Sequence, residues 1–100
     1  MAENSLLEKK IKTGITLLDF TADWCAPCKA QKPMIENIIS TYENRVSVIE
    51  INIDEQREIA TRYMVQSIPT LIIFKNGKEM RRFVGIQSET NIAKNLDQFI

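Results

Sequence analysis

The sequence of 100 residues fits one domain, and its 44% hydrophobic and 26% charged residues are typical of a folded globular protein. Lysine plus arginine and aspartate plus glutamate number 13 each, so no net charge attracts the chain to nucleic acid or an anionic membrane. The first residues carry no basic region followed by an apolar stretch, and no apolar run is long enough to span a bilayer. We therefore expect a single domain over residues 1–100, located in the cytoplasm, that binds neither nucleic acid nor membrane.

The first half of the chain predicts a helix, a strand and a second helix. Ser5-Leu6-Leu7-Glu8 has the pattern of a capping box, so a helix is expected from Ser5 to the break at Gly14. Residues 15–20 are nearly all apolar, which indicates a strand covered on both faces. The second helix is expected over residues 25–42, with a kink at Pro33. Its apolar stripe consists of Met34, Ile35, Ile38, Ile39 and Tyr42.

The second half predicts a strand, a short helix, a hairpin and a last helix. Apolar residues alternate over residues 46–53, and Asp54 follows as the expected cap of a third helix. Asn76-Gly77 predicts a tight turn between strands at residues 70–75 and 79–84. The residues expected to face inward from the third helix are Ile59, Ala60, Tyr63 and Met64.

Ser88 is the expected cap of the last helix. Its inward residues are expected to be Ile92, Ala93, Leu96, Phe99 and Ile100. The order of elements includes a strand–helix–strand unit, which gives parallel strands, and a hairpin, which adds an antiparallel edge. The sequence therefore predicts an α/β fold with a central mixed four-stranded sheet and helices on both faces.

The only two cysteines, Cys25 and Cys28, lie three residues apart at the start of the second predicted helix. Side chains at this spacing share one helix face, with Cβ atoms ~5–6 Å apart, which is near the reach of a disulfide. The free N–H groups and the dipole at a helix start stabilise a thiolate, and the pKa of such a thiol can fall from ~8.5 to ~7. Pro27 suits the first turn because its missing N–H has no intrahelical partner there.

Cys28 is expected to be buried one turn into the helix, and burial keeps a thiol protonated. We therefore predict that Cys25 attacks and Cys28 resolves. The alternatives are half of a zinc site and two ordinary core cysteines. A structural zinc takes about four Cys or His ligands, whereas the chain has two Cys and no His, so we expect no metal. Core cysteines need neither this spacing nor an intervening proline.

From residue 15 to its end, the sequence resembles the thioredoxins. The resemblance depends on the order and spacing of Asp19-Phe20, Ala22-Asp23-Trp24-Cys25-Ala26-Pro27-Cys28-Lys29, Pro33, Ile68-Pro69-Thr70, Asn76-Gly77 and Gly85. It implies the thioredoxin fold, with the strands in the order second, first, third, fourth. It also implies a cis Pro69 facing the cysteines, and a substrate-binding surface at Trp24, Ile68, Pro69 and the Val84-Gly85-Ile86 loop.

Each of these binding residues also has a purely structural interpretation. Trp24 could be a core aromatic residue, Gly85 a plain turn, and the Ile68 side chain ordinary packing. The functional interpretation is that Gly85 lets a substrate backbone approach and that the Ile68 backbone offers an edge for strand-like pairing.

Two departures from the family pattern concern the backbone. Ala26 replaces the usual glycine after the first cysteine, which changes the freedom of that turn. The N-terminal strand of many thioredoxins is absent, since too few residues precede the first helix. Residues 46–53 are then expected to form an open sheet edge. We expect a monomer, with dimerisation through this edge left open.

The third departure concerns charges beneath the cysteines. Asp19 matches the buried aspartate of the family, which helps to deprotonate the resolving thiol. The neighbouring strand carries Glu50 where relatives often have lysine, and two buried carboxylates raise at least one pKa. We hypothesise that Lys32, one turn after Cys28, completes an Asp19–Lys32–Glu50 cluster. The alternative is that Lys32 and Glu50 both point to solvent.

The resemblance implies a protein disulfide reductase that transfers electrons by dithiol–disulfide exchange. The resemblance implies no cofactor other than the redox-active Cys25–Cys28 disulfide. The implied partners are disulfide-containing protein substrates and an NADPH-linked thioredoxin reductase as the electron donor. An oxidase, an isomerase or a dedicated electron donor could use the same site. A more distant alternative is a non-enzymatic binding module with the same fold.

Overall fold

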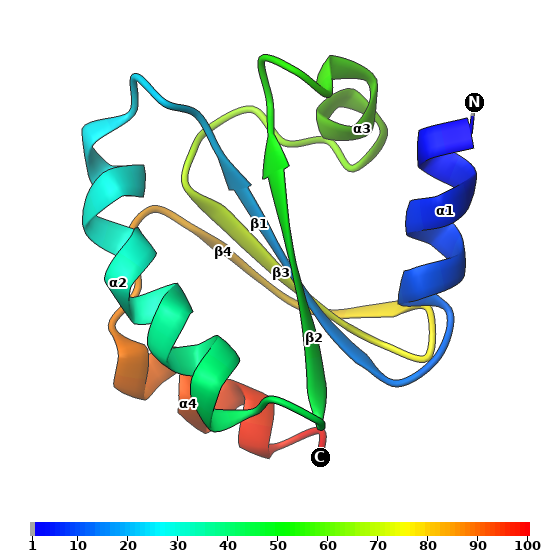
Figure 1. The fold of residues 1–100 in the computed structure, drawn as a ribbon, viewed down its shortest axis with the longest axis vertical. Helices are drawn as coiled ribbons and strands as arrows, with labels where there is room; N and C mark the ends of the chain where they lie inside the picture. Colours follow the sequence, from blue (N-terminus) through cyan, green and yellow to red (C-terminus); the bar gives the residue numbers. More distant parts are fainter. Residues whose placement is uncertain (1) are drawn as a thin grey trace.

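The computed structural model describes the backbone of residues 2–100 and the side chains from residue 6 onward. A four-stranded sheet crosses the centre of the molecule (Figure 1). Its strands are β1 (Ile15–Thr21), β2 (Val46–Asn52), β3 (Thr70–Lys75) and β4 (Lys78–Val84), in the spatial order β2-β1-β3-β4. Strand β1 runs parallel to β2 and antiparallel to β3, and β3 runs antiparallel to β4. The mixed sheet and the strand order are confirmed.

Helices cover both faces of this sheet, as predicted. They are α1 (Ala2–Ile11), α2 (Ala26–Thr41), α3 (Arg57–Arg62) and α4 (Glu89–Asp97). One apolar cluster joins the sheet to α2 and α4, and includes Leu17, Ile38 and Leu96. A second cluster, on the other face, includes Leu18 and residues of α1 and α3. Figure 1 shows α1 and α2 on opposite sides of the sheet.

Strand β1 is the centre of both clusters, because consecutive side chains of a strand point to opposite faces. Leu17 belongs to one cluster and Leu18 and Phe20 to the other, and all three are fully buried. The same strand also buries Asp19. A nearly continuous apolar strand therefore carries one acidic side chain into the interior.

Two of the four predicted helix starts were wrong. Helix α1 begins at Ala2, so Ser5 lies inside it, and the predicted capping contact of the Ser5 side chain falls outside the described residues. Helix α3 begins at Arg57 with Gln56 as its cap residue, without a side-chain capping bond. Ser88 caps α4 as predicted, because its hydroxyl oxygen accepts from the Asn91 N–H at 3.1 Å.

Three apolar residues expected in the core are exposed instead: Ile39, Met64 and Ile100. The buried stripe of α2 is Cys28, Gln31, Ile35 and Ile38, so Ile39 is rotated one position beyond it. Met64 and Ile100 lie after the last turns of α3 and α4, where helical periodicity no longer applies. Helix α2 continues through Pro33.

The open sheet edge is confirmed for the residues that the structure describes. Strand β2 pairs only with β1, and residues 2–100 provide no strand on its other side. Within the same residues, no helix is long and apolar enough to cross a membrane.

Candidate active site

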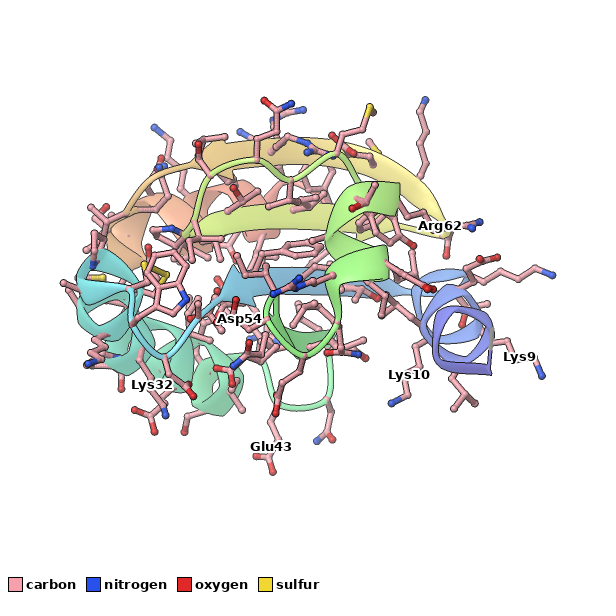
Figure 2. All side chains as sticks on the ribbon, turned by 90° about the horizontal axis from the view of Figure 1, so that it is seen from above. Lys9, Lys10, Lys32, Glu43, Asp54 and Arg62 are labelled. Atoms are coloured by element: carbon pink, nitrogen blue, oxygen red, sulfur yellow. A yellow bond between two sulfur atoms is a disulfide. The ribbon has the colours of Figure 1, made fainter. Side chains whose placement is uncertain are left out.

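The two cysteines meet at the first turn of α2, where the chain leaves β1. Cys25 is the cap residue of the helix, with extended backbone angles, and its sulfur accepts from the Cys28 N–H at 3.2 Å. The two sulfurs form a disulfide, with Cα atoms 5.2 Å apart. Figure 2 shows this disulfide in yellow at one end of the molecule, with Lys9 and Lys10 of α1 at the opposite end.

A sulfur in the cap position takes the place of a capping oxygen, because it satisfies an N–H that has no intrahelical partner. Ala26 and Pro27 follow as the first two residues of the helix, where the missing N–H of proline costs no bond. In the disulfide form both cysteines are buried, with 4% of Cys25 and 5% of Cys28 exposed. The predicted burial of Cys28 is present, and Cys25 is equally buried in this form.

Two further segments meet the cysteines. The Ile68–Pro69 peptide bond is cis, as the family resemblance implies, and Pro69 is buried. The Cys25 sulfur lies 3.9 Å from the Ile68 carbonyl oxygen. The Gly85 N–H donates to the Pro69 carbonyl at 2.8 Å, which attaches the chain leaving β4 to the cis peptide. The site therefore combines residues 24–28, 68–69 and 84–86.

Position 85 favours glycine because of its backbone conformation, and not because a larger side chain would lack space. Its φ of +94° lies in a region that L side chains rarely adopt. A Cβ atom built on it meets no heavy atom within 4 Å. The glycine thus allows a backbone conformation that other residues rarely adopt, and the space beside its α-carbon is open.

Exposed apolar side chains lie next to Cys25 and Gly85 in the chain. Trp24 is 67% exposed, Val84 62% and Ile86 47%. We call these three residues the apolar rim. The Trp24 indole N–H donates to the Asp54 carboxylate at 2.7 Å, so the ring is fixed while most of it faces solvent. Figure 2 labels Asp54 in the connection between β2 and α3. A core role for Trp24 is excluded by its exposure.

A buried acid lies on the other side of the disulfide. Asp19 is 5% exposed, and burial, with a smaller contribution from the charge of Glu50, raises its pKa from 3.8 to about 6. A cavity of about 360 Å³ connects this acid to Cys28. Its lining includes Asp19, Cys28, Lys32 and Glu50.

The hypothesised Asp19–Lys32–Glu50 charge cluster is not formed in this structure. Lys32 and Glu50 line the same cavity as Asp19, but among the described side chains neither carboxylate forms an ion pair with Lys32 within 4.0 Å. Both Lys32, labelled on α2 in Figure 2, and Glu50 are exposed. Asp19 is therefore a buried carboxyl without a cationic partner in this structure.

The comparisons with known proteins agree with this geometry. A family model described as Thioredoxin matches residues 2–98. The chain belongs to the thioredoxin family. A thioredoxin of Staphylococcus aureus is 39% identical over 93 residues, which cover 93% of this chain and 89% of the relative.

Solved thioredoxin structures superpose closely on this one. Thioredoxin of Fasciola hepatica matches with a TM-score of 0.87 and 29% identity, over 99% of this chain and 93% of that chain. Oxidised mitochondrial thioredoxin 3 of Saccharomyces cerevisiae matches with a TM-score of 0.86 and 27% identity, over 95% and 89%. The predicted family and fold are thus confirmed.

Family membership and the paired cysteines identify the protein as a thioredoxin-type thiol–disulfide oxidoreductase that reduces disulfides. Thioredoxins use their own redox-active disulfide as the reaction centre, which here is Cys25–Cys28. Among residues 2–100, no group of three or more His, Cys, Asp or Glu side chains could hold a metal ion.

Sequence analysis missed two residues that hold the site together. Asp54 was assigned to a helix cap, although it anchors Trp24. Gln31 was not singled out, although it is 1% exposed and bonds to the chain after Gly85. A signal for Gln31 was present, because it follows Cys28 by three residues and so shares the buried face of the helix.

Proposed function

We propose that the protein is a general reductant of protein disulfides in which Cys25 makes the first attack. The observation that supports this most directly is the Cys25 sulfur at the cap of α2, within 3.2 Å of the Cys28 N–H. In the reduced protein this N–H and the helix dipole stabilise a thiolate. The thiolate forms a bond to one sulfur of the substrate disulfide, and the other sulfur leaves as a thiolate that takes a proton from solvent.

The second step releases the substrate. The Asp19 carboxylate accepts the proton of the Cys28 thiol, directly or through water in the shared cavity. Cys28 then attacks the Cys25 sulfur, the mixed disulfide breaks, and the second substrate thiol leaves. Two electrons have moved from the dithiol to the substrate, and the intramolecular disulfide remains. A pKa of about 6 leaves most Asp19 ionised at neutral pH and close to the acidity range useful for a base.

Substrates are proposed to bind across the apolar rim in extended conformation. Trp24, Val84 and Ile86 supply exposed apolar area around the disulfide. The Ile68 backbone next to the Cys25 sulfur offers an edge for strand-like pairing. Ala26 and Pro27 fix the turn between the two cysteines.

The remaining partners follow from the chemistry. Each turnover leaves the protein oxidised, so a reductase must restore the dithiol, and we propose an NADPH-linked thioredoxin reductase. No cofactor is needed, since both exchanging sulfurs belong to this chain. For the same reason a monomer suffices. We propose that the protein acts in the cytoplasm, without binding nucleic acid or membrane.

The direct test is turnover with purified thioredoxin reductase and NADPH, with insulin as the disulfide substrate. We expect NADPH consumption that depends on insulin and disappears in Cys25→Ser. The Cys28→Ser variant should accumulate a covalent mixed disulfide with the substrate, because the second step is blocked. A correctly folded protein that reduces insulin with neither the reductase nor dithiothreitol would contradict the proposal.

The reduction potential separates this function from the oxidase that the same site could serve. A value near about −270 mV agrees with a general reductant, whereas a value near about −120 mV indicates an oxidant. Equilibration with glutathione buffers, followed by alkylation, measures it.

A further inference from the structure

The side chain of Gln31 makes two hydrogen bonds to the backbone of one residue in the chain after β4. Its amide nitrogen donates to the Gln87 carbonyl at 2.9 Å, and its amide oxygen accepts from the Gln87 N–H at 2.7 Å. Gln31 is 1% exposed and lies three residues after Cys28 on the buried face of α2. A buried amide with its donor and its acceptor both used in this way holds two segments in one relative position.

The loop between β4 and α4 is thereby attached at both ends. At its start the Gly85 N–H donates to the Pro69 carbonyl at 2.8 Å. At its end Gln87 is bonded to Gln31. Figure 1 shows the chain leaving β4 and passing beside α2 before it enters α4. Two residues of the apolar rim, Val84 and Ile86, flank Gly85 within this attached stretch.

The side chain of Gln87 strengthens the second attachment. Its amide nitrogen donates to the Gly85 carbonyl oxygen at 3.3 Å, and its amide oxygen accepts from the Asn91 side-chain amide of α4 at 2.8 Å. The polar contacts therefore continue from the active-site helix through the loop into α4. Because α2 also carries Cys28, the same helix positions both the resolving sulfur and the loop.

We propose that Gln31 is a positioning residue that fixes the Gly85 loop relative to the cysteine pair and so determines affinity for extended protein substrates. This inference rests on the proposed function, in which the loop contacts substrate. Gln31 does not touch the reacting sulfurs, and the exchange chemistry does not require it. Its loss should therefore weaken binding of substrates that span the loop, and leave small disulfides unaffected.

The test compares a protein substrate with a small one in the variant Gln31→Met, which keeps the approximate side-chain volume but cannot form both amide bonds. We expect KM for insulin to rise about fivefold to tenfold, which corresponds to loss of about one hydrogen bond's net contribution. We expect kcat for insulin, and the rate with a small aromatic disulfide, to stay within about twofold, the range left when binding alone is changed.

Two matched variants separate positioning from general loss of structure. Asn37→Ala removes another polar contact between α2 and the α4 segment, the 2.8 Å bond to Glu89, at a place distant in sequence from the cysteines. It should leave KM unchanged. Gln87→Ala removes the side-chain bonds of Gln87 but keeps its backbone bonds to Gln31, so its KM should lie between those of wild type and Gln31→Met.

Amide hydrogen exchange at Gln87 tests the hydrogen bonds between Gln31 and Gln87 without any catalytic assay. We expect exchange to become at least about tenfold faster in Gln31→Met, since the acceptor of that N–H is lost. Gln31→Glu, which keeps an acceptor for the N–H but loses the donor when ionised, is the second variant if Gln31→Met does not fold. It should raise KM for insulin, because the bond to the Gln87 carbonyl is lost, and it should change exchange at the Gln87 N–H less than Gln31→Met does.

An unchanged KM for insulin in a folded Gln31 variant would overturn the inference, and so would equal losses with insulin and the small disulfide. Wild-type protein that fails to reduce insulin would instead contradict the proposed function. In that case the exchange rate at Gln87 would still test the hydrogen bonds between Gln31 and Gln87. Failure of the inference and failure of the proposed function can therefore be distinguished.

Discussion

The two sides of the Cys25–Cys28 disulfide differ in nearly every physical property. On the Cys25 side, the sulfur lies 3.9 Å from the Ile68 carbonyl oxygen, and the adjoining segments carry the three exposed residues of the apolar rim. On the Cys28 side, a cavity leads to the buried carboxyl of Asp19, whose pKa is raised to about 6. One side offers apolar area and backbone pairing, and the other offers a group that accepts a proton.

In the proposed mechanism, this difference separates substrate recognition from proton transfer at a single disulfide. The sulfur that we propose attacks, Cys25, must meet the substrate, so it is expected beside the exposed rim. The sulfur that we propose resolves, Cys28, must lose a proton after the substrate is bound, so it is expected beside the proposed base. The fold maintains both environments because strand β1 carries Asp19 below the start of α2, while residues 68–69 and 84–86 approach from β3 and β4.

The largest expected effect is on stability, through Asp19→Asn. The pKa of Asp19 is raised on folding, so its contribution is most favourable below pH 4 and is lost as pH rises through about 6. At pH 8 the variant should be more stable than wild type by about 2–3 kcal/mol. Urea unfolding at pH 4, 6 and 8 measures this. The control is Asp23→Asn, which removes an exposed carboxylate from the same cavity.

If the stability advantage of Asp19→Asn over wild type does not grow between pH 4 and pH 8, the pKa of Asp19 is not raised by burial as described above. The same result in Asp23→Asn and Asp19→Asn would assign the effect to net charge.

The next effect is kinetic and separates the two sides directly. Asp19→Asn should slow the resolution step at least about tenfold, because a general base is removed. The first attack by Cys25 should be nearly unchanged. Rapid-quench measurement of mixed-disulfide formation and decay resolves the two rates. Wild-type resolution should rise with pH through about 6, and that rise should be missing from the variant. Equal slowing of the first attack and of resolution would contradict a specific role of Asp19 in the resolution step.

A change on the rim should have the opposite signature. Trp24→Ala removes a 67% exposed ring, and truncating an aromatic contact of a binding surface commonly costs more than 1 kcal/mol. We expect KM for insulin to rise about fivefold or more, with the decay of the mixed disulfide unchanged. Asp54→Ala, which frees the indole N–H without removing the ring, should give a smaller increase. A change in the decay rate alone would contradict the separation.

The smallest effect concerns Glu50, which raises the pKa of Asp19 less than burial does. Glu50→Gln should lower the pKa of Asp19 only in part, so that it stays above 3.8. Carbon-13 NMR of the Asp19 carboxyl measures this in the disulfide form. Lys32→Ala provides the comparison, and it should change the pKa little because no ion pair joins Lys32 to either carboxylate. A large shift in Lys32→Ala would restore the charge-cluster hypothesis.

Sequence patterns predicted the elements best where a single cause determines them. The apolar run of β1, the Asn76-Gly77 turn and the Ser88 cap depend on local chemistry and were predicted correctly. Asp54 was misassigned because its carboxylate can either cap a helix or accept a hydrogen bond from an indole N–H. Which of the two occurs depends on Trp24, thirty residues away in the sequence.

Site features that depend on distant packing could not be predicted from spacing alone. The cis bond before Pro69 came from family resemblance, because a cis isomer is a minority outcome for any proline. The pairing of Gln31 with the Gln87 backbone joins residues 56 positions apart, and nothing local in either segment indicates it. The failure of Lys32 to reach Asp19 depends on a side-chain conformation that the sequence leaves free.

The central claim is that the sulfur capping α2 is the one that attacks. Limited alkylation of the fully reduced, folded protein with iodoacetamide at pH 6–7, followed by mass spectrometry of peptides, tests it directly. Both cysteines are similarly buried in the disulfide form, so a preference would reflect thiolate character and access gained on reduction. We predict that Cys25 is modified first, with Cys28 largely unmodified. Modification of Cys28 first, or of both at equal rates, would contradict it.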